Sequence, residues 1–576
     1  MLLTLAIFFP LAAALVVLCI PGQYKQAIKV VSLIGALLCL YVTLHVMAGF
    51  YCDKIPVETM EQFFAKKIDT TLKKLGNDQE KTLRGLLESH TFTYPVKTFS
   101  LNTREDQTLK NWGLERTYEQ LVEWELARHA PQAKTLRFTE YCNWIPSFGI
   151  AYFVAVDGLS LPLIFLSALL GVLCIIYSWN IEKGIKAYFA FFLLLITALM
   201  GVFLALDFFL FFVFWEIVLL PMYFLIGIWG GPRRIYAAIK FFIYTLIGSV
   251  LMLLSMIVLY FYSEPHTFNL VSLMSLAPGF SKNFQWWIFL ALFIGFAIKV
   301  PVFPFHTWLP DAHVEAPTAV SVILAGVLLK MGGYGFFRFN YTITPDASQD
   351  PGFIWMIALL GVINIVYGAF CALAQKDFKS MVAYSSISHM GYVLLGMSAF
   401  TYAGVQGASL QMFNHGLSSA LMFMIVGVLY DRAHHRRLND FGGIALQMPY
   451  YTGIAIVGFF ASLGLPGLNG FVSEMMVFLG AYQGFANTRY LPMVYVALSG
   501  IVLTAVYILW TVQRVYMGEI KEQYKEFPDL NCREALSMIP LAVLCIVVGV
   551  YPKFVLDVLA PAMNIIVDMV KLVTAI

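Results

Sequence analysis

The chain has 576 residues, of which 60% are hydrophobic and 12% are charged, and its mean hydropathy is +0.76. Soluble domains have about 25% charged residues, so this composition excludes a soluble globular protein and indicates a membrane protein. The net charge of +3 is too small to indicate nucleic-acid binding. The eight cysteines contain no C-x-x-C pair and show no ligand spacing with histidine, which argues against an iron–sulfur or zinc site.

Apolar runs long enough to cross a bilayer recur along the whole chain. There are fourteen of them, at 2–20, 28–50, 158–177, 187–206, 208–228, 235–262, 286–304, 318–339, 353–374, 381–400, 407–430, 452–484, 491–512 and 535–551. The last segment, 552–576, carries Asp557, Asp568 and Lys571 among apolar residues, which predicts an amphipathic helix at the membrane surface. The sequence therefore predicts an all-α polytopic membrane protein with about fourteen transmembrane helices.

Basic residues gather in the loops that follow the first, third, fifth, ninth, eleventh and thirteenth runs. They are Lys25, Lys29, Lys183, Lys186, Arg233, Arg234, Lys376, Lys379, Arg432, Arg436, Arg437, Arg514, Lys521, Lys525 and Arg533. All these loops fall on one side of the membrane, and short loops rich in Lys and Arg face the cytoplasm. The other short loops are poor in basic residues, with Lys282, Arg338 and Arg489 as exceptions. We therefore expect both termini on the outer, periplasmic side.

A polar segment interrupts the apolar pattern after the first two runs, which occupy residues 1–50. It spans 51–144 and falls on the outer side, and helical spacing of its apolar residues at 59–76 and 117–130 predicts a small helical insert. Residues 145–157 after it predict a short strand or hairpin on the outer face. Cys52 and Cys142 lie at the two ends of the insert, where they form either a disulfide, in an oxidising compartment, or two free thiols.

Six ionisable residues within apolar runs are candidates for a functional site. They are Glu216, Lys299, Lys330, His389, His415 and Glu474. A charged group at bilayer depth costs several kcal/mol, so such residues indicate an ion or proton pathway. A lysine near the end of a run, such as Lys299, can also extend to the interface, but Lys330 has about a dozen residues of its run before it. A neutral structural role for Glu216 and simple packing roles for the histidines are the alternatives.

Two of these residues lie beside breaks in a predicted helix. Lys299 comes just before Pro301, and Glu474 follows a Pro-, Gly- and Asn-rich stretch at 466–470, at the start of the resumed half. Two interrupted helices about five spans apart are typical of an inverted-repeat transporter. We therefore expect a third helix at 158–180 and inverted repeats at 181–343 (helices 4–8) and 344–517 (helices 9–13). A cytoplasmic loop and a fourteenth helix occupy 518–551.

Four stretches resemble the M-type antiporter-like subunits of respiratory complex I, the proton-translocating NADH:quinone oxidoreductase. They are FFVFWEIVLLPMYFLIGIWG, AIKVPVFPFHTWLPDAHVEAPTAVSVILAGVLLK, DFKSMVAYSSISHMGYV and LGLPGLNGFVSE. The resemblance implies a fourteen-helix fold with two inverted five-helix repeats. It implies that Glu216 and Lys299 form an ion pair and that Lys330 is a central proton relay. His389 and His415 would connect that relay to Glu474, the terminal protonatable residue. Related L- and N-type subunits usually have lysine in place of Glu474, so this position favours the M type.

The same resemblance implies which cofactors and partners to expect. The chain would be a non-redox subunit of the enzyme that binds no cofactor itself, with NADH, FMN, iron–sulfur clusters and quinone bound by partner subunits. The L-type and N-type antiporter-like subunits would be its neighbours in a bacterial inner membrane. A subunit of an Mrp-type Na⁺/H⁺ antiporter or of a membrane-bound hydrogenase complex is the alternative. The 51–144 insert departs from the usual pattern of the family.

Overall fold

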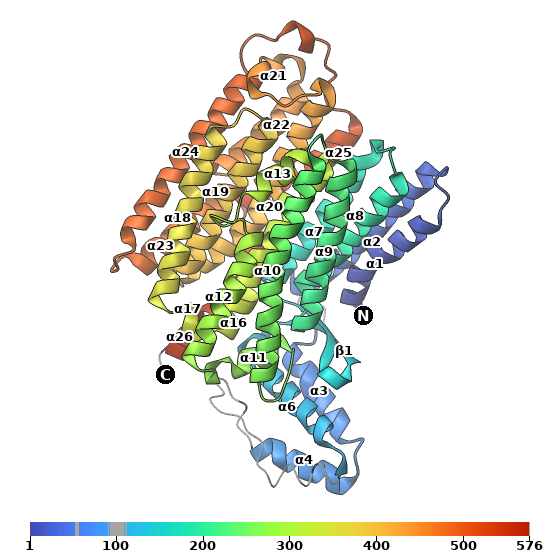
Figure 1. Cartoon of the computed structure of the whole chain (residues 1–576), viewed down its shortest axis with the longest axis vertical. Helices are drawn as coiled ribbons and strands as arrows, with labels where there is room; N and C mark the ends of the chain where they lie inside the picture. The colour runs from blue at the N-terminus through green and yellow to red at the C-terminus, as the bar shows by residue number, and fades with distance from the viewer. Residues whose placement is uncertain (52–56, 90–91, 93–108, 110–111, 575–576) are drawn as a thin grey trace.

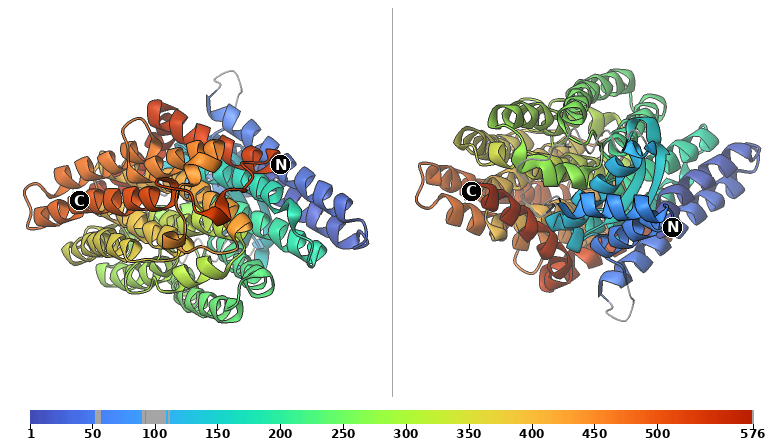
Figure 2. Two further views of the ribbon diagram at one scale, coloured as in Figure 1. Left: turned by 90° about the horizontal axis from the view of Figure 1, so that it is seen from above. Right: turned by 90° about the horizontal axis from the view of Figure 1, so that it is seen from below.

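The computed structural model describes residues 1–51, 57–89, 92, 109 and 112–574, and it forms a bundle of long helices with the insert at one end (Figure 1). We call the end of the bundle that carries the insert the insert face, and the opposite end, which carries α21 (Ile444–Gln447), the loop face. Viewed along its long axis, the bundle is elongated, with the first helices at one edge (Figure 2). The all-α membrane fold is confirmed.

The helices before the first break pack as neighbours in chain order. They are α1 (Leu2–Cys19), α2 (Lys25–Tyr51), α7 (Ser160–Tyr177), α8 (Ile185–Leu204), α9 (Phe208–Trp229), α10 (Arg234–Tyr262), the short α11 (Leu270–Leu276) and α12 (Lys282–Lys299). Asp207 caps α9 by accepting a hydrogen bond from the amide of Leu210. Pro301 and Pro304 follow Lys299, the last residue of α12, and the chain resumes as α13 (Trp308–Glu315). The predicted interruption at Lys299 is therefore present.

The next helix runs through the centre of the bundle. It comprises α14 (Thr318–Ile323), the π-helical η5 (Leu324–Leu328), α15 (Leu329–Gly335), the π-helical η6 (Phe336–Asn340) and α16 (Tyr341–Ile343). Every residue of the apolar window of this helix is buried. π-helical turns inside α-helices often mark functional sites, and here two of them flank α15, which carries Lys330.

The second half of the bundle contains the second interruption. Its elements are α17 (Pro345–Ser348), α18 (Pro351–Leu373), α19 (Phe378–Ser398), α20 (Tyr402–Ala433), α22 (Pro449–Leu463), α23 (Asn469–Phe485), α24 (Leu491–Tyr516), α25 (Cys532–Val550) and α26 (Lys553–Thr574). Gly464 ends α22 with a positive φ of 80°, a conformation that glycine adopts without strain, and Pro466 follows it. Glu474 is the sixth residue of α23, so it lies in the second turn of the resumed helix and not at its start.

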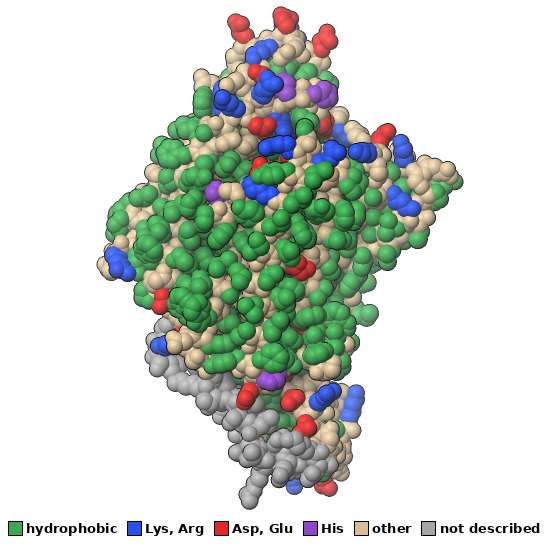
Figure 3. Space-filling view, in the orientation of Figure 1, with side chains coloured by type: hydrophobic (Ala, Val, Ile, Leu, Met, Phe, Trp, Pro, Cys, Tyr) green, Lys and Arg blue, Asp and Glu red, His purple; other side chains and the backbone are tan. Residues whose placement is uncertain are grey.

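Eleven helices of the described residues are long and apolar enough to span a bilayer. The other three predicted runs fall on α12, on α19 and on the broken pair α22 and α23. The count of fourteen and the inverted repeats stay predictions. Seen from one side, the middle of the bundle is covered by apolar side chains, and Lys and Arg side chains gather toward the loop face (Figure 3).

The insert folds from helices and a β-hairpin. The predicted helices at 59–76 and 117–130 are α3 (Met60–Leu72) and α6 (Glu115–His129). A further helix, α4 (Asn77–Ser89), lies between them in sequence, and the short η1 (Pro131–Lys134) follows α6. β1 (Arg137–Ile145) pairs antiparallel with β2 (Ile150–Val156), so the hairpin begins before residue 145, inside the range assigned to the insert. Cys142 is exposed on β1, whereas Cys52 lies outside the described residues, and their disulfide stays a prediction.

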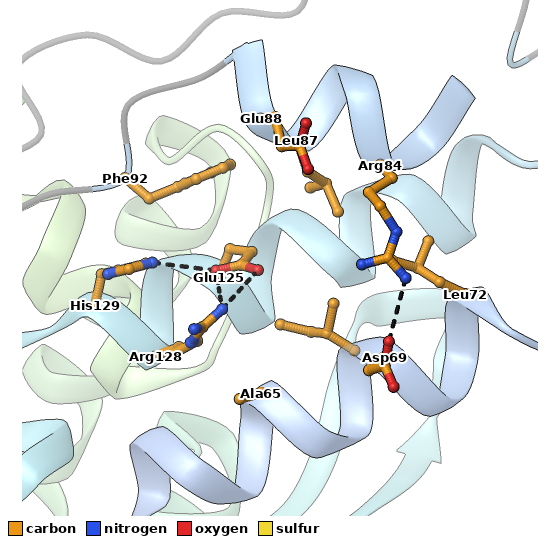
Figure 4. A pocket seen from close by; sticks show the side chains of 11 residues that line it. Ala65, Asp69, Leu72, Arg84, Leu87, Glu88, Phe92, Glu125, Arg128 and His129 are labelled. Carbon is orange, nitrogen blue, oxygen red and sulfur yellow. Dashed lines mark hydrogen bonds and ion pairs between the residues drawn. The ribbon is translucent and has the colours of Figure 1, made fainter. Parts of the chain in front are cut away.

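A cavity of about 470 Å³ lies between the helices of the insert (Figure 4). Its charged lining residues contact one another. Asp69 accepts a hydrogen bond from Arg84 at 3.2 Å, and Glu125 accepts one from Arg128 at 3.3 Å and lies 3.3 Å from His129. These pairs satisfy charges at the junction of α3, α4 and α6, and the simplest account of the cluster is structural.

Candidate functional site

Four of the six predicted residues form a chain of contacts in the centre of the bundle. The Lys330 Nζ atom lies 2.8 Å from His415 Nδ1 and also donates a hydrogen bond to the carbonyl of Ala325. The rings of His415 and His389 lie 5.5 Å apart, centre to centre. His389 Nδ1 lies 3.2 Å from Glu474 Oε1, although the two groups are not aligned as a hydrogen bond. All four side chains are at most 7% exposed.

The local structure explains why these groups meet. Lys330 donates to the carbonyl of Ala325, five residues earlier, beside the π-helical turn η5. His415 comes from α20, the long buried helix, and His389 comes from α19, next to it. The broken helix supplies the rest of the site, because Ser462, at the end of α22, lies 3.0 Å from His389 Nε2, and Glu474 lies in α23.

Amide side chains fix the start of α23 against α20. The Asn414 side-chain amide donates to the carbonyl of Asn469 at 2.7 Å and to Ser473 Oγ at 3.0 Å. In return, Asn469 Nδ2 donates to the carbonyl of Asn414 at 3.1 Å, and Ser473 Oγ donates to Gln411 Oε1. These bonds, next in sequence to His415 and Glu474, hold the two protonatable residues on neighbouring helices in register.

Lys299 and Glu216 lie apart from this chain of contacts. Lys299 is 1% exposed, and its Nζ atom lies 5.4 Å from the ring centres of both Trp215 and Phe241. A cation between two aromatic faces is stabilised by about 0.5–2 kcal/mol per face. Among the described residues, Lys299 Nζ and Glu216 Oε1 have no hydrogen-bond partner and no ion pair within 4.0 Å joins the two side chains. The ion pair implied by the resemblance, and the roles of both residues, therefore stay predictions.

Sequence reasoning assigned no role to two further buried groups near the loop face. His313, in α13, is fully buried and stacks on Phe423 of α20 at 4.3 Å, and neither of its ring nitrogens has a hydrogen-bond partner within the described chain. Lys379, counted above as a loop lysine, is 4% exposed and donates to the carbonyl of Ala316. A cavity of about 170 Å³ lies beside them, lined by Glu315, Lys379 and Arg436 among others. Both residues have charged neighbours in sequence, Asp311 and Glu315 beside His313 and Lys376 and Asp377 beside Lys379, so the sequence does not mark either as buried.

The arrangement suits the movement of protons. We call the series Lys330, His415, His389 and Glu474 the row. Its amine, two imidazoles and carboxylate can each bind and release a proton, and adjacent groups lie within or close to the distance that a hydrogen bond or a one-water bridge spans. Over the residues that the structure describes, no group of three His, Cys, Asp or Glu side chains could hold a metal ion. The row therefore supplies acid–base groups without a recognisable metal site.

Comparison with known proteins places these residues in a family. A model described as the NADH:quinone oxidoreductase/Mrp antiporter transmembrane family matches residues 205–504, and one described as NADH-ubiquinone oxidoreductase chain 4, amino terminus, matches residues 134–206. The NADH-quinone oxidoreductase subunit M of Rickettsia prowazekii is 44% identical over 443 residues, which cover 76% of this chain and 87% of that protein. The subunit of the same name from Rhodobacter capsulatus is 43% identical over 449 residues, covering 76% and 86%.

Solved structures share the fold. A chain of respiratory complex I from Thermus thermophilus superimposes with a TM-score of 0.77 at 24% identity, covering 99% of this chain and 100% of that one. A chain of the Mrp complex from Dietzia sp. superimposes with a TM-score of 0.65 at 19% identity, covering 81% and 96%. One family model covers more than half of the chain and the relatives align over most of their length, so the chain belongs to the NADH:quinone oxidoreductase/Mrp antiporter transmembrane family.

Proposed function

We propose that this chain is the M-type proton-translocating subunit of NADH:quinone oxidoreductase, respiratory complex I. The relatives named subunit M are 43–44% identical, far above the 19% identity to the Mrp complex chain, which favours complex I over an antiporter complex. The observation that carries the proposal is the buried series Lys330, His415, His389 and Glu474, which are in contact or nearly so across the bundle.

The proposed route has an entry, a row and an exit. Protons enter from the cytoplasm, charge Lys299 and Lys330, pass to His415 and His389, and leave toward the outer side near Glu474. Moving one charge against 100 mV costs about 2.3 kcal/mol, which the rearrangement of a charge held in low dielectric can supply. Glu216 stabilises the protonated Lys299 across a distance greater than 4 Å, and a change in a neighbouring subunit weakens that interaction.

The partners follow from the same family membership. We infer that L-type and N-type antiporter-like subunits flank this chain in a bacterial inner membrane, and that NADH, FMN, iron–sulfur clusters and quinone are bound by other subunits. Glu216 supports a membrane partner on the α9 and α10 side, because it is only partly buried near the middle of a span. A carboxyl group exposed to lipid at that depth is costly, so a second subunit covering it would relieve the cost.

The proposed orientation places the loop face in the cytoplasm and the insert face and both termini on the outer side. The gathering of Lys and Arg toward the loop face supports this orientation under the positive-inside rule (Figure 3). The 51–144 insert then folds in the periplasm, where long segments are translocated regardless of their charge.

The proposal is tested in the assembled complex with Lys330→Met, which removes the central relay while preserving an apolar stem of similar length. We expect proton uptake per electron to fall during NADH oxidation in sealed vesicles. The matched control is Lys282→Met, at an exposed lysine that begins α12, which should leave the ratio at the wild-type value. An unchanged ratio in fully assembled Lys330→Met complex would contradict the proposed function. Retention of flavin- and iron–sulfur-containing partners during purification tests the assignment to complex I.

A further inference from the structure

A second buried cation, Arg338, lies on the same central helix as Lys330 and is not part of the row described above. Arg338 is 1% exposed and falls eight residues after Lys330, with Tyr334 halfway between them. Residues four apart on a helix share one face, so Lys330, Tyr334 and Arg338 form a line that leads from the row toward the insert face. Arg338 also contacts Gln132 of the insert, which fixes the direction of that line.

The polar groups of this line bond to one another. Arg338 Nη2 forms an ion pair with Asp157 Oδ1 at 2.7 Å, Nη1 donates to Gln132 Oε1 at 3.3 Å, and Nε donates to the Tyr334 hydroxyl at 3.1 Å. That hydroxyl in turn donates to the carbonyl of Phe203 at 3.2 Å. Asp157 Oδ1 also accepts from the amide of Ser160 at 3.0 Å. The hydroxyl and this carboxylate oxygen are therefore already engaged and offer no ready place for a migrating proton.

The surroundings keep this arrangement dry and fixed. The Tyr334 ring lies 5.3 Å from the ring of Phe203 and 6.4 Å from that of Phe211. Asp157 and Gln132 are each 2% exposed. They come from the end of the β-hairpin and from the insert, so elements on the insert face hold the guanidinium from the side away from Lys330.

The chemistry of arginine decides what such a group does on a proton route. A guanidinium stays protonated at any physiological pH, so it neither accepts nor releases a proton, whereas lysine, histidine and glutamate do both. A fixed arginine in a narrow polar passage also repels protons and other cations, as in aquaporin-type pores. Arg338 is thus unsuited to carry protons and well suited to stop them.

We propose that the Arg338–Asp157 ion pair is an electrostatic barrier that closes the direct path between Lys330 and the outer side. The inference rests on the proposed function, and it explains why protons on Lys330 would move sideways to His415 and Glu474 instead of leaving or returning through the nearer end of their own helix. Gln132 of the insert accepts a hydrogen bond from the guanidinium but contributes no charge to the barrier.

The test measures passive proton entry without NADH. Assembled complex carrying Arg338→Gln with Asp157→Asn is placed in liposomes that contain a trapped pH dye and valinomycin, and the outside is acidified. We expect proton entry to rise at least about tenfold, because the variant replaces the fixed guanidinium and its carboxylate partner by neutral amides. Wild-type tightness in the assembled double variant would overturn the proposal. Should that variant not assemble, Arg338→Gln alone serves instead, because it removes the fixed positive charge that blocks the path; wild-type tightness there would also overturn the barrier.

Two further variants distinguish a charge barrier from a loss of packing. Arg432→Gln with Glu534→Gln neutralises another Arg–carboxylate pair, 2.8 Å apart near the loop face and somewhat less buried, and should stay tight. Gln132→Ala keeps the ion pair and should also stay tight; a leak equal to that of the Arg338 variant would point to packing and overturn the charge barrier.

Adding Lys330→Met to the leaking variant should abolish the leak, and a persistent leak would show a path that bypasses Lys330 and overturn the proposal. Failure of the proposed function appears instead as normal pumping by Lys330→Met alone.

Discussion

Replacing His415 with glutamine tests whether the row conducts protons. The change keeps a side-chain acceptor near Lys330 Nζ, which lies 2.8 Å from the imidazole, but removes the imidazole that lies between Lys330 and His389 and can take up a proton. Among the described residues, Lys330 contacts His415 and the His415 ring faces the His389 ring, whereas no contact joins Lys330 to His389 directly. Without the imidazole, a proton would have to pass this position with no side chain to carry it. Because a positioned proton donor or acceptor typically contributes 10²–10⁴-fold, we expect transfer through this subunit to slow at least about a hundredfold.

The assay is the number of protons taken up per electron during NADH oxidation by the assembled complex in sealed vesicles. His435→Gln is the matched control, because His435 lies in a loop, 2.8 Å from the Tyr524 hydroxyl, and takes no part in the row. We expect the ratio to fall in His415→Gln only. If His415→Gln complex pumps with the wild-type ratio at the wild-type rate, the contact between Lys330 and His415 does not conduct protons and the reasoning fails.

Three other predictions concern stability and positioning. Burial raises the pKa of Glu123 in the insert to about 7, above that of an unfolded glutamic acid. The free energy of unfolding of α6 should therefore fall as pH rises from about 4.5 through 7, by no more than about 3 kcal/mol. Hydrogen exchange of the backbone amides of Glu115–His129 measures this free energy, and in Glu123→Gln it should no longer depend on pH in this range. A Cβ at Gly480 would lie 2.1 Å from the backbone nitrogen of Gly404, so Gly480→Ala should cost about 1–3 kcal/mol in thermal unfolding. Gly453→Ala, with no atom within 4 Å, should be neutral or stabilise its helix by up to about 1 kcal/mol. Asn414→Leu removes the bonds that hold the start of α23, and we expect slower NADH-driven pumping at normal assembly; an unchanged rate would show that Glu474 is positioned by packing alone.

The residues of the row could be predicted because placing an ionisable side chain at bilayer depth costs free energy, so such a residue in an apolar run indicates a function. Lys330, His389 and His415 stood out on that ground, and proline and glycine beside Lys299 and Glu474 marked the two breaks. Distances could not be predicted in the same way. Whether Lys299 meets Glu216 depends on side-chain placement, and the lysine lies between two aromatic rings that sequence spacing does not reveal.

Other features were missed for identifiable reasons. Arg338 lies at the end of an apolar run, where a lone arginine looks like an interfacial residue, and its partner Asp157 is 181 residues away. The π-helical turns around Lys330 leave no mark in the periodicity of a uniformly apolar helix. The helix α4 of the insert has few apolar residues and went unrecognised, and β1 was included in the helical insert because only the second strand was anticipated.

The contacts that join the insert to the bundle set an order of events during synthesis. Glu123 accepts a hydrogen bond from Asn269, which is synthesised 146 residues later, and Gln132 accepts one from Arg338, which is synthesised 206 residues later. At about 5–20 residues per second, a ribosome needs roughly 10–40 s to bridge the longer interval. Glu140 and Arg137 can bond at once to α1 and α2, which are made before them, whereas the surfaces of α6 and η1 that carry Glu123 and Gln132 are made early and covered late. We expect those two surfaces to stay open to proteases and chaperones until the central helix has entered the membrane.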